Sequence, residues 1–411
     1  MRVLHVIGSI APRLGGPSRV VLELATALSE QGHEVDVVTS ALADRGSWLP
    51  RGSVQGLEPV RTGLRQAQDG YHITYCRPSW PTRWVMSREM FSVLQERIRV
   101  ADVVHIHSLY LFPTLLASRL ARAHRVPYVI RPHGTLDPYI RRRHRVAKRL
   151  YSWLIESATL RHAAAVHFTT SEERDLARPA LPEGINTCVI PLGVDVSEFA
   201  TIPDRETARS ALGLASGEFV WLFLGRLNHK KGLDLLASAF VQFAKEAPSS
   251  RLIVAGPDDD GLGKRLLDEC ALGGVANRVT LTGFLDRAQT KRALAAADSW
   301  ILPSYSENFG VAVVEAMAAQ LPVVITDRIN IWRAVQQARA GVITRAETGS
   351  VLKGMLLVAQ MPHADRVAMG ARGRELCSAS YSWTAIAREL TALYEELADK
   401  CHRPFTNQLL T

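Results

Sequence analysis

Short apolar segments alternate with helical segments twice along this chain, and this alternation limits its fold more than any other feature. Several of the apolar runs are only four to six residues long and are followed by glycine, proline or a polar loop, which is typical of strands buried on both faces of a sheet. Strands that are separated by helices pair in parallel, and helices then cover both faces of the sheet. The sequence therefore predicts an α/β protein with two parallel-sheet domains.

The first half is expected to contain strands at residues 2–7, 34–39, 102–107, 127–131 and 165–168, and its helices include 18–31 and 115–123. The second half is expected to contain strands at 219–224, 251–255, 278–281, 299–302, 323–325 and 342–343, and helices near 233–246, 262–271, 287–297 and 310–320. The boundary falls in Pro191–Asp195, which predicts domains at 1–195 and 196–381, and a final helix with its tail at 382–411. Ligands of such folds bind beyond the carboxyl ends of the strands.

Length and composition agree with a large globular enzyme. The 411 residues, of which 47% are hydrophobic, suffice for two cores. No apolar run approaches the ~20 residues of a membrane span, and Met1–Gly8 is expected to be a strand rather than a signal peptide. The five cysteines are scattered, without a CxxC pair, which indicates reduced thiols and predicts a cytoplasmic protein.

Two carboxylates, Glu307 and Glu315, lie eight residues apart across a predicted loop-to-helix junction. A fully helical spacing would separate them by ~12 Å. The backbone N–H groups at the start of the helix favour an anionic ligand, so the segment suits an extended molecule such as a nucleotide-sugar. The alternative is a helix-start charge at Glu307 and a solvated side chain at Glu315. However, valine, alanine and methionine surround Glu315 in the sequence. A carboxylate among apolar residues needs a charged or hydrogen-bonding partner.

Two cations follow the predicted strand 219–224. Arg226 and Lys231 both precede a helix start, where a positive charge is unfavourable unless an anion joins it. A planar guanidinium and a movable ammonium suit a diphosphate. Taken alone, the two residues are better explained as solvated loop cations.

The pattern Gly-Arg-x4-Lys-Gly at 225–232, followed downstream by Glu-x7-Glu at 307–315, resembles the large retaining glycosyltransferase family GT4. The resemblance covers nearly the whole chain. It implies the GT-B fold, in which two Rossmann-like domains with parallel sheets face a central cleft, the first binding the acceptor and the second the nucleotide-sugar. It also implies that the final helix crosses back to the first domain. The implied activity is a retaining, metal-independent hexosyltransferase reaction without a cofactor.

The resemblance also assigns roles to residues. It implies that Arg226 and Lys231 hold the donor pyrophosphate. Glu307 would hold the donor sugar and Glu315 the nucleotide ribose, while backbone amides near Phe309 and Gly310 would bind sugar or phosphate. Asn308 replaces a glycine that many members have before Phe-Gly. Because Asn308 adjoins the sugar-binding carboxylate, the donor sugar does not follow from the resemblance.

Two glycines, Gly15 and Gly16, link the first strand to a helix and permit close approach of a phosphate. Their spacing is not GxGxxG, and no acidic residue follows at the distance that a dinucleotide needs, which argues against an NAD enzyme. In GT4 members an equivalent loop faces the donor phosphates. A tight turn without a ligand is the alternative.

His133 follows the strand 127–131 at its carboxyl end, where it could donate to a developing charge or position a hydroxyl. In the family a histidine at this point lines the transfer site; a structural capping histidine is the alternative. His107, at the end of another strand, is a second candidate on the acceptor side. His105 and His107 share one face of their strand. With no third ligand in the pattern, no metal site is predicted.

The formal charge of +9 is concentrated in residues 77–162. Within them, the segment 139–155 has helical spacing and carries Arg141, Arg142 and Arg143 beside aromatic and aliphatic residues. An anionic membrane surface and a lipid-diphosphate acceptor are compatible partners, as is a merely solvated helix. Nucleic acid is not expected, because no nucleic-acid-binding motif accompanies the charge. The location implied is cytoplasmic, peripheral on the inner face of the membrane.

The expected function is transfer of a sugar from a nucleoside-diphosphate-sugar to a glycan, favoured as lipid-linked, in polysaccharide or cell-envelope glycan synthesis. One alternative is a nucleotide-sugar epimerase of the same fold, which needs no acceptor. Another is a catalytically silent nucleotide-sugar-binding protein, against which the intact charged set at 226, 231, 307 and 315 argues.

Overall fold

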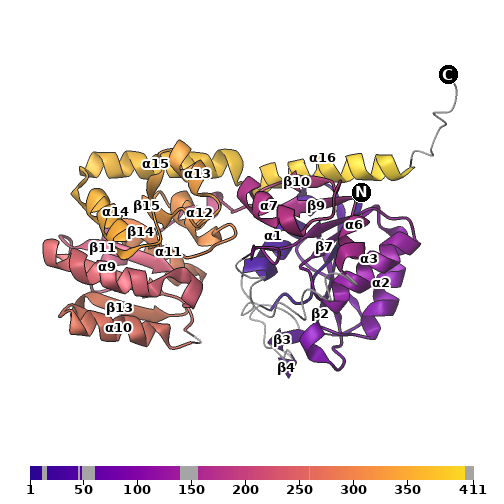
Figure 1. The fold of residues 1–411 in the computed structure, drawn as a ribbon, viewed down its shortest axis with the longest axis horizontal. Helices are drawn as coiled ribbons and strands as arrows, with labels where there is room; N and C mark the ends of the chain where they lie inside the picture. Colours follow the sequence, from indigo (N-terminus) through magenta and orange to yellow (C-terminus); the bar gives the residue numbers. More distant parts are fainter. Residues whose placement is uncertain (12–15, 45–46, 49–60, 139–155, 259, 403–411) are drawn as a thin grey trace, which may run out of the picture. The chain divides into compact units, whose positions relative to one another are not determined.

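The computed structural model describes residues 1–11, 16–44, 47–48, 61–138, 156–258 and 260–402 (Figure 1). The chain forms two compact units. The first unit combines Met1–Gly193 with Trp383–Thr411, and the second is Val194–Ser382. Each unit contains its own sheet of mainly parallel strands, so the expected α/β class with two parallel-sheet domains is confirmed.

Eight strands form the sheet of the first unit, in the order β10-β9-β8-β7-β1-β2-β6-β5. Neighbouring strands are parallel except at one edge, where β5 runs antiparallel to β6. The strands are β1 (Arg2–Val6), β2 (Glu34–Ser40), β5 (Arg65–Ala67), β6 (His72–Cys76), β7 (Val103–His107), β8 (Tyr128–Arg131), β9 (Ala165–Phe168) and β10 (Thr187–Val189). The strand order reverses between β1 and β7, and open α/β sheets bind ligands at the carboxyl side of such a reversal.

Two apolar layers enclose this sheet. One includes Val21, Leu24, Ile386 and Leu390, and so joins α1 (Gly16–Glu30) and α16 (Trp383–His402) to one face. The other includes residues of α2 (Glu89–Val100) and α3 (Phe112–Ala123) on the opposite face (Figure 1). Shorter helices are α6 (Ser157–Arg161) and α7 (Ser171–Ala177), and a small hairpin pairs β3 (Leu42–Asp44) with β4 (Ser47–Trp48). The last helix of the chain therefore packs on the sheet that the first residues begin.

Six parallel strands form the sheet of the second unit, in the order β13-β12-β11-β14-β15-β16. They are β11 (Phe219–Leu224), β12 (Ser250–Ala255), β13 (Val279–Gly283), β14 (Ser299–Leu302), β15 (Val323–Thr326) and β16 (Gly341–Thr344). This is the doubly wound order of Rossmann folds, with its reversal between β11 and β14. Both strands at the reversal are almost fully buried, as their continuous apolar sequences predict.

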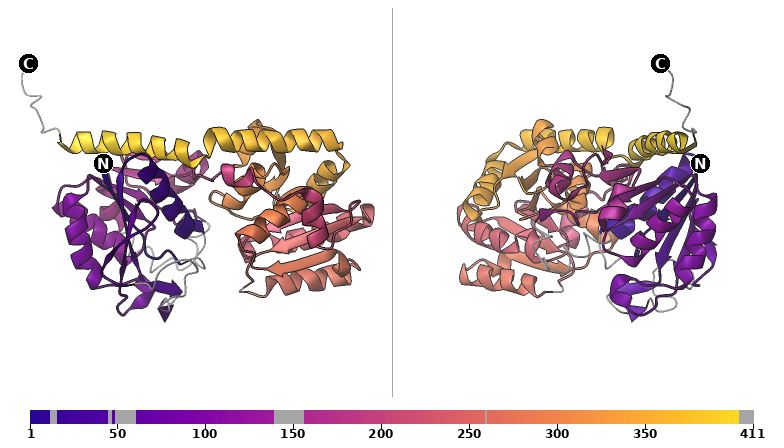
Figure 2. Two further views of the ribbon diagram at one scale, coloured as in Figure 1. Left: turned by 180° about the vertical axis from the view of Figure 1, so that it is seen from behind. Right: turned by 45° about the vertical axis from the view of Figure 1, so that its right-hand side comes forward.

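Helices lie on both faces of the second sheet (Figure 2). They are α8 (Arg205–Ala211), α9 (Leu233–Glu246), α10 (Leu262–Leu272), α11 (Arg287–Ala296), α12 (Val311–Ala318), α13 (Trp332–Gln337), α14 (Thr348–Gln360) and α15 (His363–Ser380). Helix α9 packs against α10 and α14, while α8 packs against α11 and α12 against α15. Trp221 of β11 meets Phe243 of α9 edge-on, at 5.8 Å between ring centroids. That contact fixes α9 on the sheet, and α9 follows the loop that carries Arg226 and Lys231.

The structure also holds elements that the sequence patterns did not indicate, among them β6, β10 and α2. Strand β6 reads His-Ile-Thr-Tyr-Cys, in which polar residues interrupt the apolar run, yet Thr74 is buried within it. Helix α12 is shorter than the expected 310–320, because Gly310 and Gln320 both have positive φ angles, of 82° and 61°. In the part of the chain that the structure describes, no helix is long and apolar enough to cross a bilayer.

Candidate active site

Two loops meet at the reversal point of the second sheet, one after β11 and one after β14. The backbone N–H of Tyr305 donates to the carbonyl of Lys230 at 2.7 Å, and its hydroxyl donates to Asp234 at 2.6 Å. Gly232 has a φ of 67°, and a Cβ there would lie 2.0 Å from the carbonyl oxygen of Pro303. Only glycine permits this approach, so the two loops are held at a fixed separation.

The contact between these loops joins two of the predicted site residues. The Lys231 ammonium donates to the Glu307 carboxylate, and their side chains are 17% and 23% exposed. The Glu307 backbone is tied to the loop after β15, because its N–H donates to Arg328 at 3.0 Å and its carbonyl accepts from Asn330 at 3.2 Å. A cation and a carboxylate that were expected to hold different parts of a donor are thus in direct contact.

Arg226 differs from Lys231 in having no partner among the residues that the structure describes. Its side chain is exposed and makes no hydrogen bond or ion pair with the residues that the structure describes. The preceding Gly225 lies against β12: a Cβ on Gly256 would come within 2.0 Å of the Gly225 carbonyl oxygen. The strand ends are therefore tightly packed, while the guanidinium beside them is available to an anion.

The start of α12 supplies backbone donors. Gly310 is its N-cap and offers no side chain to the helix, and the N–H groups of Asn308, Phe309 and Gly310 have no acceptor within the described ranges. The Phe309 side chain is buried and meets Tyr381 edge-on, with ring centroids 5.5 Å apart, so the ring packs inside the second unit and does not line the site. Uncapped N–H groups beside the Lys231 ammonium form a site suited to phosphate or to a sugar oxygen.

Glu315 lies inside α12 and is 7% exposed. Its partner is Arg287, whose Nη1 lies 2.9 Å from Oε1 of Glu315. Arg287 also pairs with Glu198 and stands 4.9 Å over the ring of Phe199. Burial lowers the pKa of Arg287, but the hydrogen bonds to Glu198 and Glu315 outweigh it and raise that pKa above its ordinary value. The expected partner for Glu315 therefore exists, and it is a cation on α11 that no local pattern predicted.

In the first unit, His133 lies just beyond β8 in the left-handed backbone region, with φ 51°. Gly134 follows with φ 73°, and its N–H donates to the buried Glu173 at 2.9 Å. The same carboxylate accepts from the backbone and hydroxyl of Thr169, at 2.8 Å each. His133 is partly exposed, and its Nε2 lies 3.1 Å from Nδ1 of His107. The Glu173 carboxylate thus holds the backbone of this turn. One edge of the His133 imidazole remains accessible to a ligand.

His107 does not line a surface, and this corrects its expected place on the acceptor side. It is buried, with Nε2 of its ring 3.0 Å from Nδ1 of His5 and Nδ1 facing His133. His107 can therefore act on a bound molecule only through His133. The burial follows from its position in β7, a strand with neighbours on both sides.

The structure also supplies the third histidine that the sequence pattern lacked. One ring nitrogen from each of His5, His105 and His107 lies within 4.8 Å of the other two. This set fits hydrogen bonding better than a divalent cation, because the rings of His105 and His107 stack at 4.6 Å instead of converging on one point. The group also contains no carboxylate and lies near the buried guanidinium of Arg131.

Burial, reinforced by the charge of Arg131, holds five histidines in the neutral form. It lowers the pKa of His5 and of His167 to about 3. The same causes, with the neighbouring histidines adding to them, hold the pKa values of His105, His107 and His133 well below the ordinary range.

Four of the predicted site residues, namely Gly15, Arg141, Arg142 and Arg143, lie outside the residues that the structure describes, as does the whole segment 139–155. Gly16 is the first residue of α1, so its backbone N–H is at a helix start.

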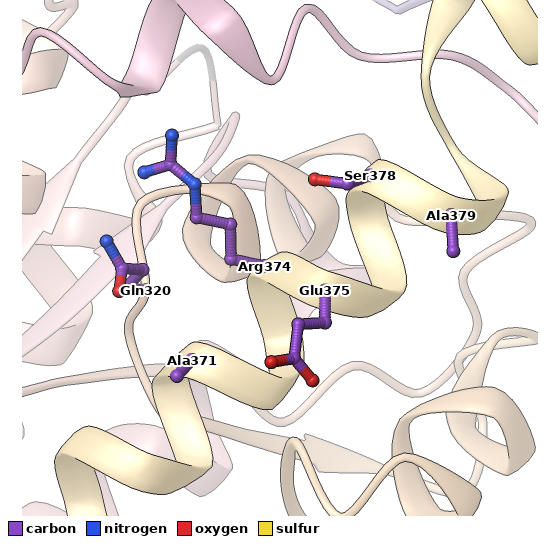
Figure 3. A pocket seen from close by; sticks show the side chains of 6 residues that line it. All are labelled: Gln320, Ala371, Arg374, Glu375, Ser378 and Ala379. Atoms are coloured by element: carbon purple, nitrogen blue, oxygen red, sulfur yellow. The ribbon is translucent and has the colours of Figure 1, made fainter.

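A separate depression of about 590 Å³ lies on the second unit (Figure 3). Its lining residues are Gln320, Ala371, Arg374, Glu375, Ser378 and Ala379. Five of the six come from α15, and none belongs to the loops after β11 and β14. It is therefore distinct from the charged site described above.

Comparison with known proteins places both units in families. Residues 204–376 match the family model described as Glycosyl transferases group 1. Residues 15–193 match the model described as Glycosyl transferase 4-like domain. The first match contains both loops of the candidate site, and the second contains the buried histidines from His105 onward.

Individual relatives agree with these matches. A D-inositol 3-phosphate glycosyltransferase of Nocardia farcinica is 32% identical over 233 residues, which are 55% of this chain and 51%, about half, of that relative. A GDP-mannose:cellobiosyl-diphosphopolyprenol alpha-mannosyltransferase of Xanthomonas oryzae pv. oryzae is 28% identical over 354 residues, 84% of each chain. The solved structure of HepE from Anabaena in complex with UDP-glucose has a TM-score of 0.75 at 20% identity, covering 96% of this chain and 100% of that one. At this level of identity, the similarity to HepE shows a shared fold.

Proposed function

Because the chain belongs to the GT4 group of glycosyltransferases and has the GT-B fold, we propose that it carries out a retaining, metal-independent transfer of a sugar from a nucleoside-diphosphate-sugar to a glycan. The observation that carries the proposal is the cluster at the reversal of the second sheet. There, Lys231 and Glu307 meet at the start of α12, and the exposed Arg226 follows β11 in the same loop as Lys231.

We assign the donor to the second unit and the acceptor to the first. Arg226, Lys231 and the uncapped N–H groups before α12 would bind the diphosphate, and Glu307 would bind sugar hydroxyls. Glu315, held by Arg287, would bind the nucleotide ribose. The relatives' names mention both UDP-glucose and GDP-mannose, so the proposal is the class of donor.

The chemistry of this set is electrostatic. The bond between the anomeric carbon and the diphosphate breaks, and a bond from the acceptor hydroxyl forms on the same face of the sugar. The hydroxyl proton passes to an oxygen of the departing phosphate. Negative charge grows on that phosphate, and two cations with oriented N–H groups can stabilise it without a metal ion. The side chain of Lys231 would then exchange part of its contact with Glu307 for the phosphate.

The acceptor is proposed to be a lipid-linked glycan of the cell envelope. The name of the Xanthomonas relative includes a diphosphopolyprenol acceptor, which supports this class. The basic segment 139–155 would attach the protein to an anionic membrane on its cytoplasmic side, since each cation near such a surface contributes ~1 kcal/mol. Sedimentation with anionic and neutral liposomes tests the attachment. Equal binding to both, or unchanged binding after substituting Glu at Arg141, Arg142 and Arg143, would contradict it.

The donor class is tested with UDP-, GDP-, ADP- and TDP-sugars in a thermal unfolding assay, because a ligand at 100 times its Kd stabilises the folded protein by ~2.7 kcal/mol.

With the donor identified, we expect Arg226→Ala to reduce the rate of transfer by about 10²–10³-fold, as loss of an oxyanion donor does. Arg292→Ala is the matched control, since Arg292 is an exposed cation of α11 outside the site. Transfer by Arg226→Ala within a few-fold of wild type would refute the phosphate assignment. A changed sugar without any acceptor would instead identify an epimerase.

Metal independence is tested by chelation. Asp258, in the one run of acidic residues near a strand end, already accepts N–H groups of Leu262 and Gly263 at the start of α10, at 2.8 and 2.9 Å. We therefore expect EDTA to leave the rate unchanged. Loss of turnover that Mg²⁺ restores would show that the leaving group needs a cation.

A further inference from the structure

The buried histidines of the first unit form two hydrogen-bonded chains. The first runs from Tyr394 through His105 and His167 to the carbonyl of Ile190, with contacts of 2.6, 3.4 and 2.7 Å. Because a carbonyl only accepts, Nε2 of His167 must carry a proton. Its Nδ1 is then bare and accepts from His105, whose Nδ1 in turn accepts from the Tyr394 hydroxyl. The Ile190 carbonyl, which can only accept, therefore sets the position of every proton in this chain.

The second chain joins His5, His107 and His133, with contacts of 3.0 and 3.1 Å. Each ring is neutral, so each has one N–H and one bare nitrogen. Two arrangements satisfy both contacts. Either all N–H groups point toward His133, or all point toward His5.

The buried end of the chain decides between these arrangements. Nε2 of His5 is buried and has no hydrogen-bond partner in the described part of the protein. If the N–H groups pointed toward His5, the chain would end in an orphaned buried N–H, which native structures avoid. In the other arrangement the chain ends in a bare nitrogen. The nearby Arg131 guanidinium also opposes further protonation of these rings.

We propose that His107 holds His133 in the tautomer whose proton is on Nδ1, so that His133 presents an N–H donor to the substrate. The proposal rests on the function above and deepens it. The ligand atom is an oxygen that accepts, such as a hydroxyl or a phosphate oxygen of the substrate that the first unit binds. His133 is then not the base that removes the proton of the acceptor. His107 is a positioning residue, because it acts only through His133.

The backbone supports this assignment. His133 keeps its positive φ while the N–H of Gly134 is tied to Glu173, so the backbone that carries the ring is fixed, and the contact with His107 orients the ring itself. Its Nδ1 has no partner among the described residues, and the ring is partly exposed. The N–H therefore points to where a ligand can reach it.

The test is a long-range ¹H–¹⁵N spectrum of the wild-type protein labelled with ¹⁵N-histidine, recorded without substrate at neutral pH. We expect His133, identified by loss of its signals in His133→Phe, to have a protonated Nδ1 and a bare Nε2. His167 provides an internal reference with the opposite tautomer. A proton on Nε2 of His133, or a doubly protonated ring, would overturn the proposal. Since no turnover is involved, this result does not depend on the proposed reaction.

Two variants separate positioning from simple support of the fold. In His107→Phe the link is cut, so we expect both tautomers of His133 and a kcat lower by about tenfold, with the donor KM little changed. Tyr394→Phe is the matched control, because it removes one buried hydrogen bond from the other chain. We expect the His133 spectrum of Tyr394→Phe to equal that of wild type. A single unchanged tautomer in His107→Phe would show that His107 does not set it.

Discussion

At the scale of single residues, the candidate site is defined by pairs whose members come from distant segments. Lys231 contacts Glu307, and Glu315 contacts Arg287. Each pair gives a carboxylate in a partly apolar setting a cationic partner and fixes its direction. Under the proposed function, a donor that displaces the Lys231 contact would therefore meet a carboxylate whose direction is already set.

Removing the cation of the first pair tests this arrangement. In Lys231→Ala we expect sugar transfer to fall by about 2–4 kcal/mol of transition-state stabilisation, because the leaving phosphate loses a positive charge. The stability of folding should change by no more than ~1 kcal/mol, as for other partly exposed ion pairs. Steady-state kinetics and urea unfolding measure the two quantities. Equal losses in Lys231→Ala and Arg292→Ala would show that net charge, and not this ammonium, matters.

At the scale of elements, the close packing of the loops after β11 and β14 depends on glycine more than on charged residues. We expect Gly232→Ala to weaken donor binding and to destabilise the second unit by roughly 1–3 kcal/mol, because a Cβ there meets the Pro303 carbonyl at a positive φ. Gly349→Ala is its control: this glycine is the second residue of α14, and nothing lies within 4 Å of its added Cβ. The control should be neutral or stabilising. Similar unfolding midpoints for the two variants would contradict the tight contact between the loops.

The same scale shows what the sequence could predict. Strands β9, β11 and β14 lie within the predicted ranges, because a short continuous apolar run between two loop segments indicates a buried strand. Helix α2 was not predicted, although its buried residues Met90, Leu94 and Ile98 have helical spacing; the polar residues between them reduce that signal. In the site, motif spacing indicated Lys231 and Glu307 but not their contact. His5, Arg131 and Arg287 were missed because their partners are far away in sequence and meet only through strand order and helix packing.

At the scale of the whole molecule, the buried histidines affect stability. His5 and His167 have a pKa of about 3 in the folded protein and about 6.5 when unfolded. Below pH 6.5 the unfolded chain takes up protons that the native state excludes, so stability falls as the pH falls toward 3. Each such group costs about 2 kcal/mol at pH 5. Urea unfolding at pH 7.5 and 5.5 measures the loss, and His167→Phe should reduce its slope. A midpoint that does not change over this range would refute the buried, neutral histidines.

The chain enters and leaves the second unit at two neighbouring points, and this makes the unit replaceable. The second unit begins at Val194 and ends at Ser382, and these two residues pair as neighbours, while Gly193 packs directly against Trp383. The second unit is therefore an insertion between adjacent points of the first. A gene in which codon 193 is joined to codon 383 through a short spacer would encode the first unit with its last helix in place. Second units from other family members could be inserted at the same two junctions, and the resulting chimeras would test whether this unit sets the choice of donor.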